Sequence, residues 1–215
     1  MFHKTINNLD LIKKEIQSKI SKLNYLNYNP KIIAICKTFP ISDVLPLINH
    51  GHVHFGENKV QESIEKWTDI KNDFKNIKLH MVGKLQTNKV KYVLPLFDYI
   101  HSLDNIKLAE KISNEQQKIG KKIKIFIQVN IGNESQKSGI LVENLFSFYK
   151  KCQNDFGLQI EGLMCIPPND NKSEIYFSKM KKLSDQINLS ELSMGMSDDY
   201  LKACEYKTTF FRIGS

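Results

Sequence analysis

Cysteine is scarce in this sequence. The chain of 215 residues contains four cysteines, which are far apart and form no CxxC pair: Cys36, Cys152, Cys165 and Cys204. Zinc clusters and disulfide frameworks need closely spaced or paired cysteines, so the sequence indicates neither. The pattern favours a reducing compartment, and we expect a cytoplasmic protein.

Long apolar runs are also lacking. No stretch is long enough to cross a bilayer, and the first residues are charged and periodic, unlike the basic segment and apolar core of a signal peptide. Gly/Ser linkers, low-complexity segments and shifts in composition are absent as well. We therefore expect one domain over residues 1–215 and no membrane partner.

Several motifs that carry chemistry are missing. GxGxxG does not follow the first predicted strand, GxxxxGK[ST] occurs nowhere, and residues 193–197 read SMGMS rather than GxSxG. Glu57 and Asp104 have no evident carboxylate partner for acid–base work, and His80 and His101 lie in no metal-ligand pattern. The sequence therefore predicts no metal site and no catalytic residues of these classes.

The charge is positive but gives little sign of nucleic-acid binding. Thirty-one Lys and Arg against 23 Asp and Glu give a net charge of +8, while 41% hydrophobic residues exclude a disordered chain. The lysine clusters near residues 118–124 and 179–182 lie on predicted amphipathic helices without interleaved aromatics. A solvated face explains them better than nucleic acid does, so no nucleic-acid partner is expected.

What the sequence does contain is a regular alternation of strand and helix patterns. The predicted strands cover residues 32–38, 52–55, 77–82, 97–101, 123–130, 158–164, 189–193 and 208–212. The predicted helices cover residues 6–23, 42–49, 58–67, 86–96, 106–119, 142–152, 174–188 and 197–204. This order predicts an α/β fold, a (β/α)8 TIM barrel, and an open doubly wound sheet is the alternative.

Lys37 lies at the carboxyl end of the first apolar strand. Chemistry in α/β folds gathers at the carboxyl ends of parallel strands, and an amine half-desolvated there becomes more nucleophilic, as a Schiff-base lysine requires. A single lysine after a strand more often extends into water. Lys37 is therefore a candidate that depends on its neighbours.

If the barrel forms, the strand ends make a polar ring at its mouth. Its members are Lys37, Asn58, His80, Asn130, Met164, Ser193, Arg212, Gly214 and Ser215. Such a ring suits a phosphorylated aldehyde, with Lys37 for the imine, and Ser193 and the Gly214–Ser215 amides for the phosphate. Each member also has a plainer explanation, such as a helix cap, a turn or an ion pair, so only their convergence supports a site.

Several long stretches resemble the YggS/PROSC family of pyridoxal-phosphate homeostasis proteins. They are residues 34–38 (AICKT), 55–62 (FGENKVQE), 80–89 (HMVGKLQTNK), 129–139 (VNIGNESQKSG), 162–164 (GLM), 192–199 (LSMGMSDD) and 212–215 (RIGS). The stretches are correctly ordered and cover nearly the whole chain. The resemblance implies a barrel of fold type III, like the N-terminal domain of alanine racemase, that binds pyridoxal 5′-phosphate (PLP).

By that resemblance PLP would form a Schiff base with Lys37. Ser193, Gly214 and Ser215 would bind its phosphate, Arg212 would approach the pyridine nitrogen, and Asn58 and His80 would complete the cofactor site.

Two features depart from the family pattern: Cys36 stands where a Ser or another small residue is common, and the sequence ends at Ser215, where relatives continue. A terminal carboxylate beside a phosphate would weaken PLP binding.

The resemblance implies a protein that buffers PLP and delivers it to PLP-dependent apoenzymes, without catalysis of its own, as a monomer or weak dimer. The alternative is a racemase-like PLP enzyme that uses Lys37 as imine and base.

Overall fold

The computed structural model describes residues 4–214, and its eight strands close into a parallel barrel in sequence order. The strands are β1 (Lys31–Ile35), β2 (His54–Glu57), β3 (Lys78–Met81), β4 (Tyr99–Leu103), β5 (Lys124–Gln128), β6 (Ile160–Met164), β7 (Glu191–Ser193) and β8 (Phe210–Ile213). β8 pairs with β1, from Lys31 opposite Phe210 to Ala34 opposite Ile213, and this pairing closes the ring. The predicted (β/α)8 barrel is confirmed, and the open sheet is excluded.

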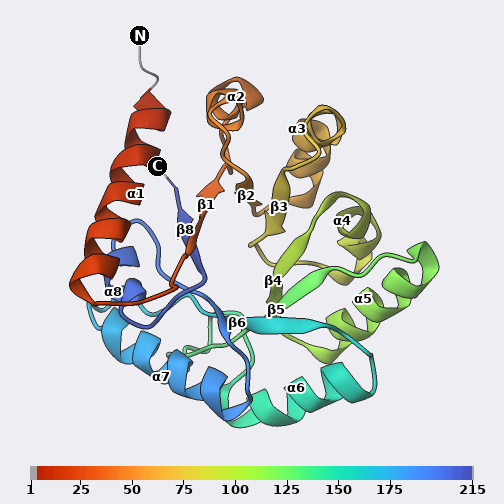
Figure 1. Ribbon diagram of the computed structural model, residues 1–215. Helices are drawn as coiled ribbons and strands as arrows, with labels where there is room; N and C mark the ends of the chain where they lie inside the picture. Colours follow the sequence, from red (N-terminus) through yellow and green to blue (C-terminus); the bar gives the residue numbers. More distant parts are fainter. Residues whose placement is uncertain (1–3, 215) are drawn as a thin grey trace.

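Helices surround the strands, as Figure 1 shows. They are α1 (Lys4–Lys22), α2 (Ile41–Asn49), α3 (Val60–Asp73), α4 (Val90–Leu96), α5 (Ile106–Ile119), α6 (Leu145–Asn154), α7 (Ser173–Gln186) and α8 (Tyr200–Cys204). Short 3₁₀ turns precede α4 and α6, at Thr87–Lys89 and Val142–Asn144. In residues 4–214 no helix is both long and apolar enough to cross a bilayer.

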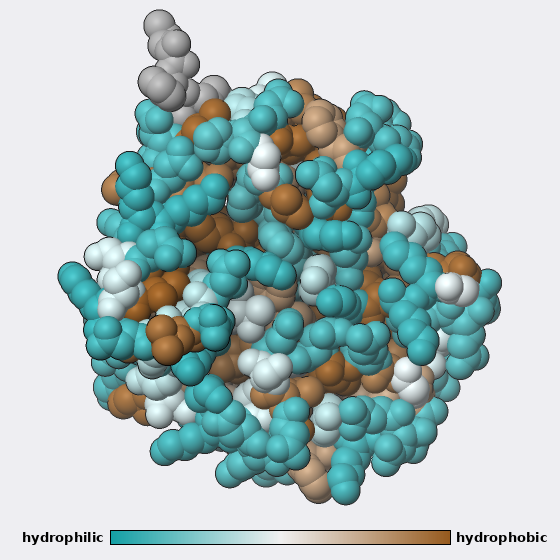
Figure 2. Space-filling model, in the orientation of Figure 1, coloured by the Kyte–Doolittle hydropathy of each residue, from teal (hydrophilic) through white to brown (hydrophobic). Residues whose placement is uncertain are grey.

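Alternation along the strands divides the buried side chains into two sets. Outward side chains pack with the helices in the main core, where Trp67, Phe97 and Phe177 are fully buried. Inward side chains fill the barrel with a smaller cluster: Ile33, Tyr99, Phe126, Met164 and Phe210. The outer surface is largely hydrophilic on the face drawn in Figure 2, with hydrophobic residues visible between the polar ones.

Some element boundaries differ from the expected ones. β1 ends at Ile35, so Lys37 lies two residues beyond the strand. α2 begins at Ile41, one residue before the predicted start, and its N-cap residue Pro40 makes no side-chain hydrogen bond. α8 begins at Tyr200 because residues 196–199 form a turn, in which the Met196 N–H donates to Asp199 Oδ1 at 2.7 Å.

Candidate functional site

The inward face of β1 leads directly to Lys37. Ile33 belongs to the barrel interior, and Ile35 packs against the same inner cluster. Lys37 follows in a turn that is closed by the hydrogen bond from the Phe39 N–H to the Cys36 carbonyl at 3.2 Å, just beyond the carboxyl end of β1. Its side chain is exposed, so the expectation of a half-desolvated amine is wrong for the protein alone.

The backbone that carries Lys37 is anchored from behind by α3. Lys66 Nζ donates to the Cys36 carbonyl and to Glu57 Oε1, both at 2.7 Å, and Trp67 Nε1 donates to the same carboxylate oxygen at 2.9 Å. Glu57 is fully buried. The ion pair between β2 and α3 therefore fixes the peptide that precedes Lys37.

Arg212 is a buried cation on the inward face of β8. Its Nη1 donates to Ser193 Oγ at 2.8 Å and its Nη2 donates to the Cys165 carbonyl at 2.7 Å. The side chain is 5% exposed and burial lowers the guanidinium pKa, although the charge of Asp199 acts in the opposite direction. No carboxylate in residues 4–214 lies close enough to form an ion pair with the guanidinium. An uncompensated buried charge costs several kcal/mol, or about 3–5 kcal/mol when a partner has been removed. The guanidinium is thus suited to an anion or another acceptor from outside the protein.

Ser193 does not lie beside Gly214, as the sequence analysis expected of two phosphate ligands. Ser193 pairs with Phe210, the first residue of β8, whereas Gly214 follows the last residue of that strand. Ser193 is also fully buried. Its hydroxyl contacts His101 Nδ1 at 2.9 Å as well as Arg212. Ser193 therefore supports Arg212 from beneath the mouth.

Ser197 takes the place at the mouth that was expected of Ser193. Its Oγ donates to the Gly214 carbonyl at 3.1 Å, and its side chain is exposed. The loops after β7 and β8 meet here, which is where barrels commonly bind phosphate. Ser197 was not among the predicted site residues, although its position just after the seventh predicted strand was a usable signal. Ser215, the other expected phosphate ligand, lies outside the described residues.

Asn58 lies just beyond β2 with an unused acceptor. Its Oδ1 is buried, and no described residue forms a hydrogen bond with it. A Cβ on Gly83 would lie 2.3 Å from the Asn58 carbonyl oxygen, so the loop after β3 packs directly against this segment. Buried acceptors are rarely left without a donor, and Asn58 Oδ1 is therefore available to a ligand.

Two members of the expected ring are occupied elsewhere. Asn130 Nδ2 donates to the Glu134 carbonyl at 2.8 Å and its Oδ1 accepts from the Glu134 N–H at 3.1 Å, so Asn130 shapes the loop after β5. Met164 is fully buried in the barrel interior. The polar groups of Asn130 are thus used by its own loop, and the side chain of Met164 packs in the barrel interior.

His80 lies in a row of imidazoles inside the barrel rather than at its mouth. His54 Nδ1 and His80 Nε2, His80 Nδ1 and His101 Nε2, and His101 Nδ1 and Ser193 Oγ are each 2.9 Å apart. His80 and His101 are fully buried, and burial lowers their pKa well below 6.5. The row joins the inward faces of β2, β3 and β4 to Ser193 and Arg212.

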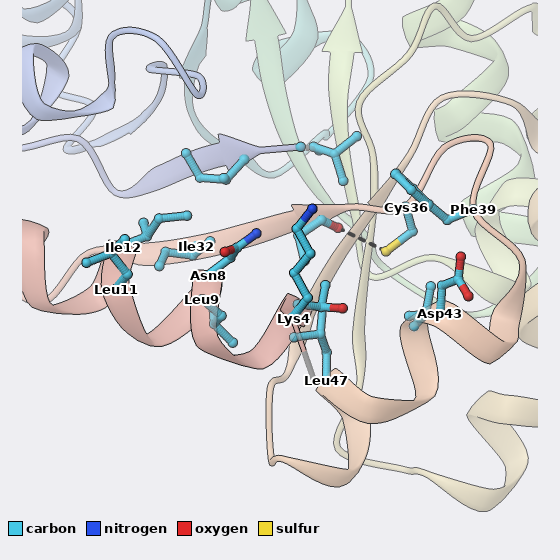
Figure 3. A pocket seen from close by; sticks show the side chains of 16 residues that line it. Lys4, Asn8, Leu9, Leu11, Ile12, Ile32, Cys36, Phe39, Asp43 and Leu47 are labelled. Atoms are coloured by element: carbon cyan, nitrogen blue, oxygen red, sulfur yellow. Dashed lines mark hydrogen bonds between the residues drawn. The ribbon is translucent and has the colours of Figure 1, made fainter. Parts of the chain in front are cut away.

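A largely apolar cavity of about 640 Å³ lies between α1, α2 and the strands β1 and β8 (Figure 3). Leu9, Val44 and Leu47 of the helices line it together with Ile32 and Cys36, which face outward from the barrel. Its polar lining residues are Lys4, Thr5, Asn8 and Asp43. The cavity also reaches Gly214, but Lys37, Arg212 and Ser197 are not part of its lining.

The buried histidines make stability depend on pH. Burial lowers the pKa of both His52 and His54 to about 4, so between pH 6.5 and 4 the unfolded chain binds protons that the folded chain does not. We expect the free energy of unfolding to fall as pH drops through this range, by up to about 1.4 kcal/mol per pH unit for each histidine.

Urea unfolding at pH 7 and pH 5 measures this dependence. His54→Asn should have a shallower pH dependence than the wild type. Equal slopes in the two proteins would contradict a neutral, partly buried His54.

The Lys66 anchor gives a second prediction. Lys66→Met leaves the Glu57 carboxylate buried without a cation, so we expect a loss of about 3–5 kcal/mol in the free energy of unfolding. Adding Glu57→Gln removes the unpaired charge and should restore part of the loss. Urea unfolding of the two variants tests this, and a double variant no more stable than Lys66→Met would contradict it.

Comparison with known proteins gives consistent matches. The family described as alanine racemase, N-terminal domain, matches residues 9–215. The pyridoxal phosphate homeostasis protein of Haemophilus influenzae is 37% identical over 219 residues, covering 97% of this chain and 92% of the relative. That of Aquifex aeolicus is 36% identical over 194 residues, covering 86% and 84%.

Solved structures agree. A protein from Bifidobacterium adolescentis superposes with a TM-score of 0.90 at 27% identity, covering 97% of this chain and 92% of that one. PipY of Synechococcus elongatus with PLP bound has a TM-score of 0.79 at 30% identity, covering 93% and 97%. An alanine racemase of Clostridium difficile, at 14% identity, a TM-score of 0.70 and coverage of 94% and 54%, shares the fold.

Proposed function

Because the chain belongs to the alanine racemase N-terminal domain family and matches pyridoxal phosphate homeostasis proteins over nearly its full length, we propose that it binds PLP through Lys37 and serves PLP homeostasis. We propose that residues 1–215 form one domain in this role. PipY, a 30% identical relative, has been solved with PLP bound, which supports the choice of cofactor.

The observation that carries this proposal is the buried guanidinium of Arg212 beneath the mouth. Its described partners, Ser193 Oγ and the Cys165 carbonyl, are both neutral acceptors. The buried Asn58 Oδ1 offers an unused acceptor nearby in the ring of strand ends. A phosphorylated pyridine aldehyde has an acceptor nitrogen, an anionic group and a carbonyl carbon, which match Arg212, the phosphate loops and Lys37.

When bound, PLP supplies an aldehyde that condenses with amines and a pyridine ring that can take up electrons. Lys37 provides the amine at the mouth, and the Lys66 anchor behind it limits where that amine can lie. Ser197 and Gly214 hold the phosphate end, together with Ser215. Arg212 donates to the ring nitrogen from below.

We propose a carrier rather than an enzyme. A guanidinium stays protonated and donates a hydrogen bond without giving up its proton, so Arg212 keeps an acceptor nitrogen uncharged. This weakens the electron uptake that racemisation needs. A racemase-like activity is the second candidate because the fold is shared with racemases.

The carrier role implies partners and a compartment. The cofactor would pass to PLP-dependent apoenzymes in the cytoplasm, where such enzymes work, from a monomer or weak dimer. The four free, buried cysteines support a reducing compartment.

Borohydride trapping tests the site. Purified protein mixed with PLP should show a visible absorption band that borohydride removes, with the pyridoxyl group on Lys37 in the peptide map. Lys37→Ala should lose both, whereas Lys84→Ala, which removes another exposed lysine, should keep both. A reducible band that persists in Lys37→Ala would contradict the proposal.

The loaded protein then separates the carrier from the enzyme. We expect it to reactivate a PLP-dependent apoenzyme and to leave L- and D-alanine unchanged. Racemisation that disappears in Lys37→Ala would instead support the second candidate.

A further inference from the structure

The row of imidazoles inside the barrel ends on Arg212, and the proposed binding of PLP does not use it directly. We propose that His54, His80 and His101 form a hydrogen-bond chain with a single direction, which positions Arg212 through Ser193. The three imidazoles then position Arg212 for its ligand. The identity of that ligand as PLP rests on the proposed function, whereas the direction of the chain does not.

The direction of the chain is set at Ser193. A guanidinium can only donate, so Ser193 Oγ accepts from Arg212 Nη1 at 2.8 Å. Within residues 4–214 the other partner of this hydroxyl is His101 Nδ1, at 2.9 Å. The single hydroxyl proton therefore points to His101, and His101 Nδ1 accepts it.

Neutral imidazoles carry this direction through the barrel. A neutral ring has one N–H, so His101 carries its proton on Nε2 and donates to His80 Nδ1. His80 in turn donates from Nε2 to His54 Nδ1. His54 then carries its proton on Nε2, and its side chain is partly exposed, so water can accept that hydrogen bond.

The opposite direction leaves a proton without a partner. It would make His101 Nδ1 a donor, and Ser193 Oγ would then receive two donors while its own proton pointed at no described acceptor. A buried, unpaired polar group costs about 1–3 kcal/mol. The low pKa of His80 and His101, caused by burial, also disfavours a charged ring with two N–H groups.

Aromatic packing fixes the planes of the rings. His80 stacks on Tyr99 with centroids 4.2 Å apart and an angle of 8°, and His101 stacks on Phe126 at 4.6 Å and 3°. Phe210 makes T-shaped contacts with both imidazoles. Because the rings cannot turn freely, the direction of the hydrogen bonds can reverse only if each imidazole changes its tautomer.

The first test measures tautomers in the protein without ligand. Long-range ¹H–¹⁵N spectra of ¹⁵N-histidine-labelled protein should show His54, His80 and His101 neutral at pH 7 with the proton on Nε2. An Nδ1–H tautomer or an imidazolium at His101 would overturn the proposal.

Two variants at the exposed end test the coupling. His54→Asn keeps an acceptor oxygen near the position of Nδ1, so His101 should keep its Nε2–H tautomer. His54→Leu leaves an unpaired proton in either direction of the chain, so His101 should become a mixture of tautomers. If His101 remains fully in the Nε2–H form in His54→Leu, the chain is not coupled and the proposal fails.

PLP affinity tests the positioning of Arg212. His101→Leu should weaken PLP binding by about tenfold, the effect of losing one buried hydrogen bond, and His101→Asn should restore most of the affinity. Should His101→Leu not fold, His54→Leu against His54→Asn provides the same comparison, with a smaller loss. Equal affinity across each pair would overturn the positioning role. If the wild type binds no PLP, the proposed function fails. The tautomer measurements would still show whether the hydrogen-bond chain has the proposed direction.

Discussion

The burial of one guanidinium organises the functional end of this barrel. Arg212 is buried, no carboxylate in the described chain forms an ion pair with it, and Asp199 acts on it only from a distance. The two hydrogen-bond partners of its guanidinium are neutral oxygens. Such a charge is costly for a protein that uses it only for packing. It is less costly for a protein that presents it to a ligand, because the ligand then supplies the missing acceptor. The cluster beneath the mouth is best understood as the support for that charge.

Alternation along the strands explains how the support is built. Every second residue of each strand faces the interior, so β2, β3 and β4 each contribute a histidine, β7 contributes Ser193 and β8 contributes Arg212. The lower interior is filled by Tyr99, Phe126 and Phe210, whose rings fix the imidazoles from the side. The polar groups thus lie between this apolar layer and the carboxyl ends of the strands.

Most of the fold could be predicted from the sequence, because the strand and helix periods repeat without interruption around the barrel. The mouth was harder to predict. Strand periodicity identified Lys37 and Arg212, but it could not tell that β1 stops at Ile35 and leaves Lys37 exposed. Ser193 and Ser197 belong to the same short segment after the seventh predicted strand. Only the structure shows that Ser193 pairs with Phe210 within the sheet, whereas Ser197 contacts Gly214.

The histidine row could not be recognised one residue at a time. His54, His80 and His101 belong to three strands, and a lone histidine at a strand end says little. Their common inward position becomes informative only once the register of β2, β3 and β4 is known. Asn130 was predicted at the mouth from its position alone, but its side-chain amide forms hydrogen bonds with the backbone of Glu134 in the same loop. Those hydrogen bonds could not be predicted from the sequence.

The central claim is that Arg212 is retained for a ligand rather than for the fold. Thermal unfolding of the wild type and of Arg212→Gln, each with and without PLP, tests it most directly, since a ligand that binds the folded state raises the midpoint. The account predicts that Arg212→Gln alone is about as stable as the wild type and gains little or nothing from PLP. A variant that is much less stable, yet gains as much from PLP as the wild type does, would contradict it.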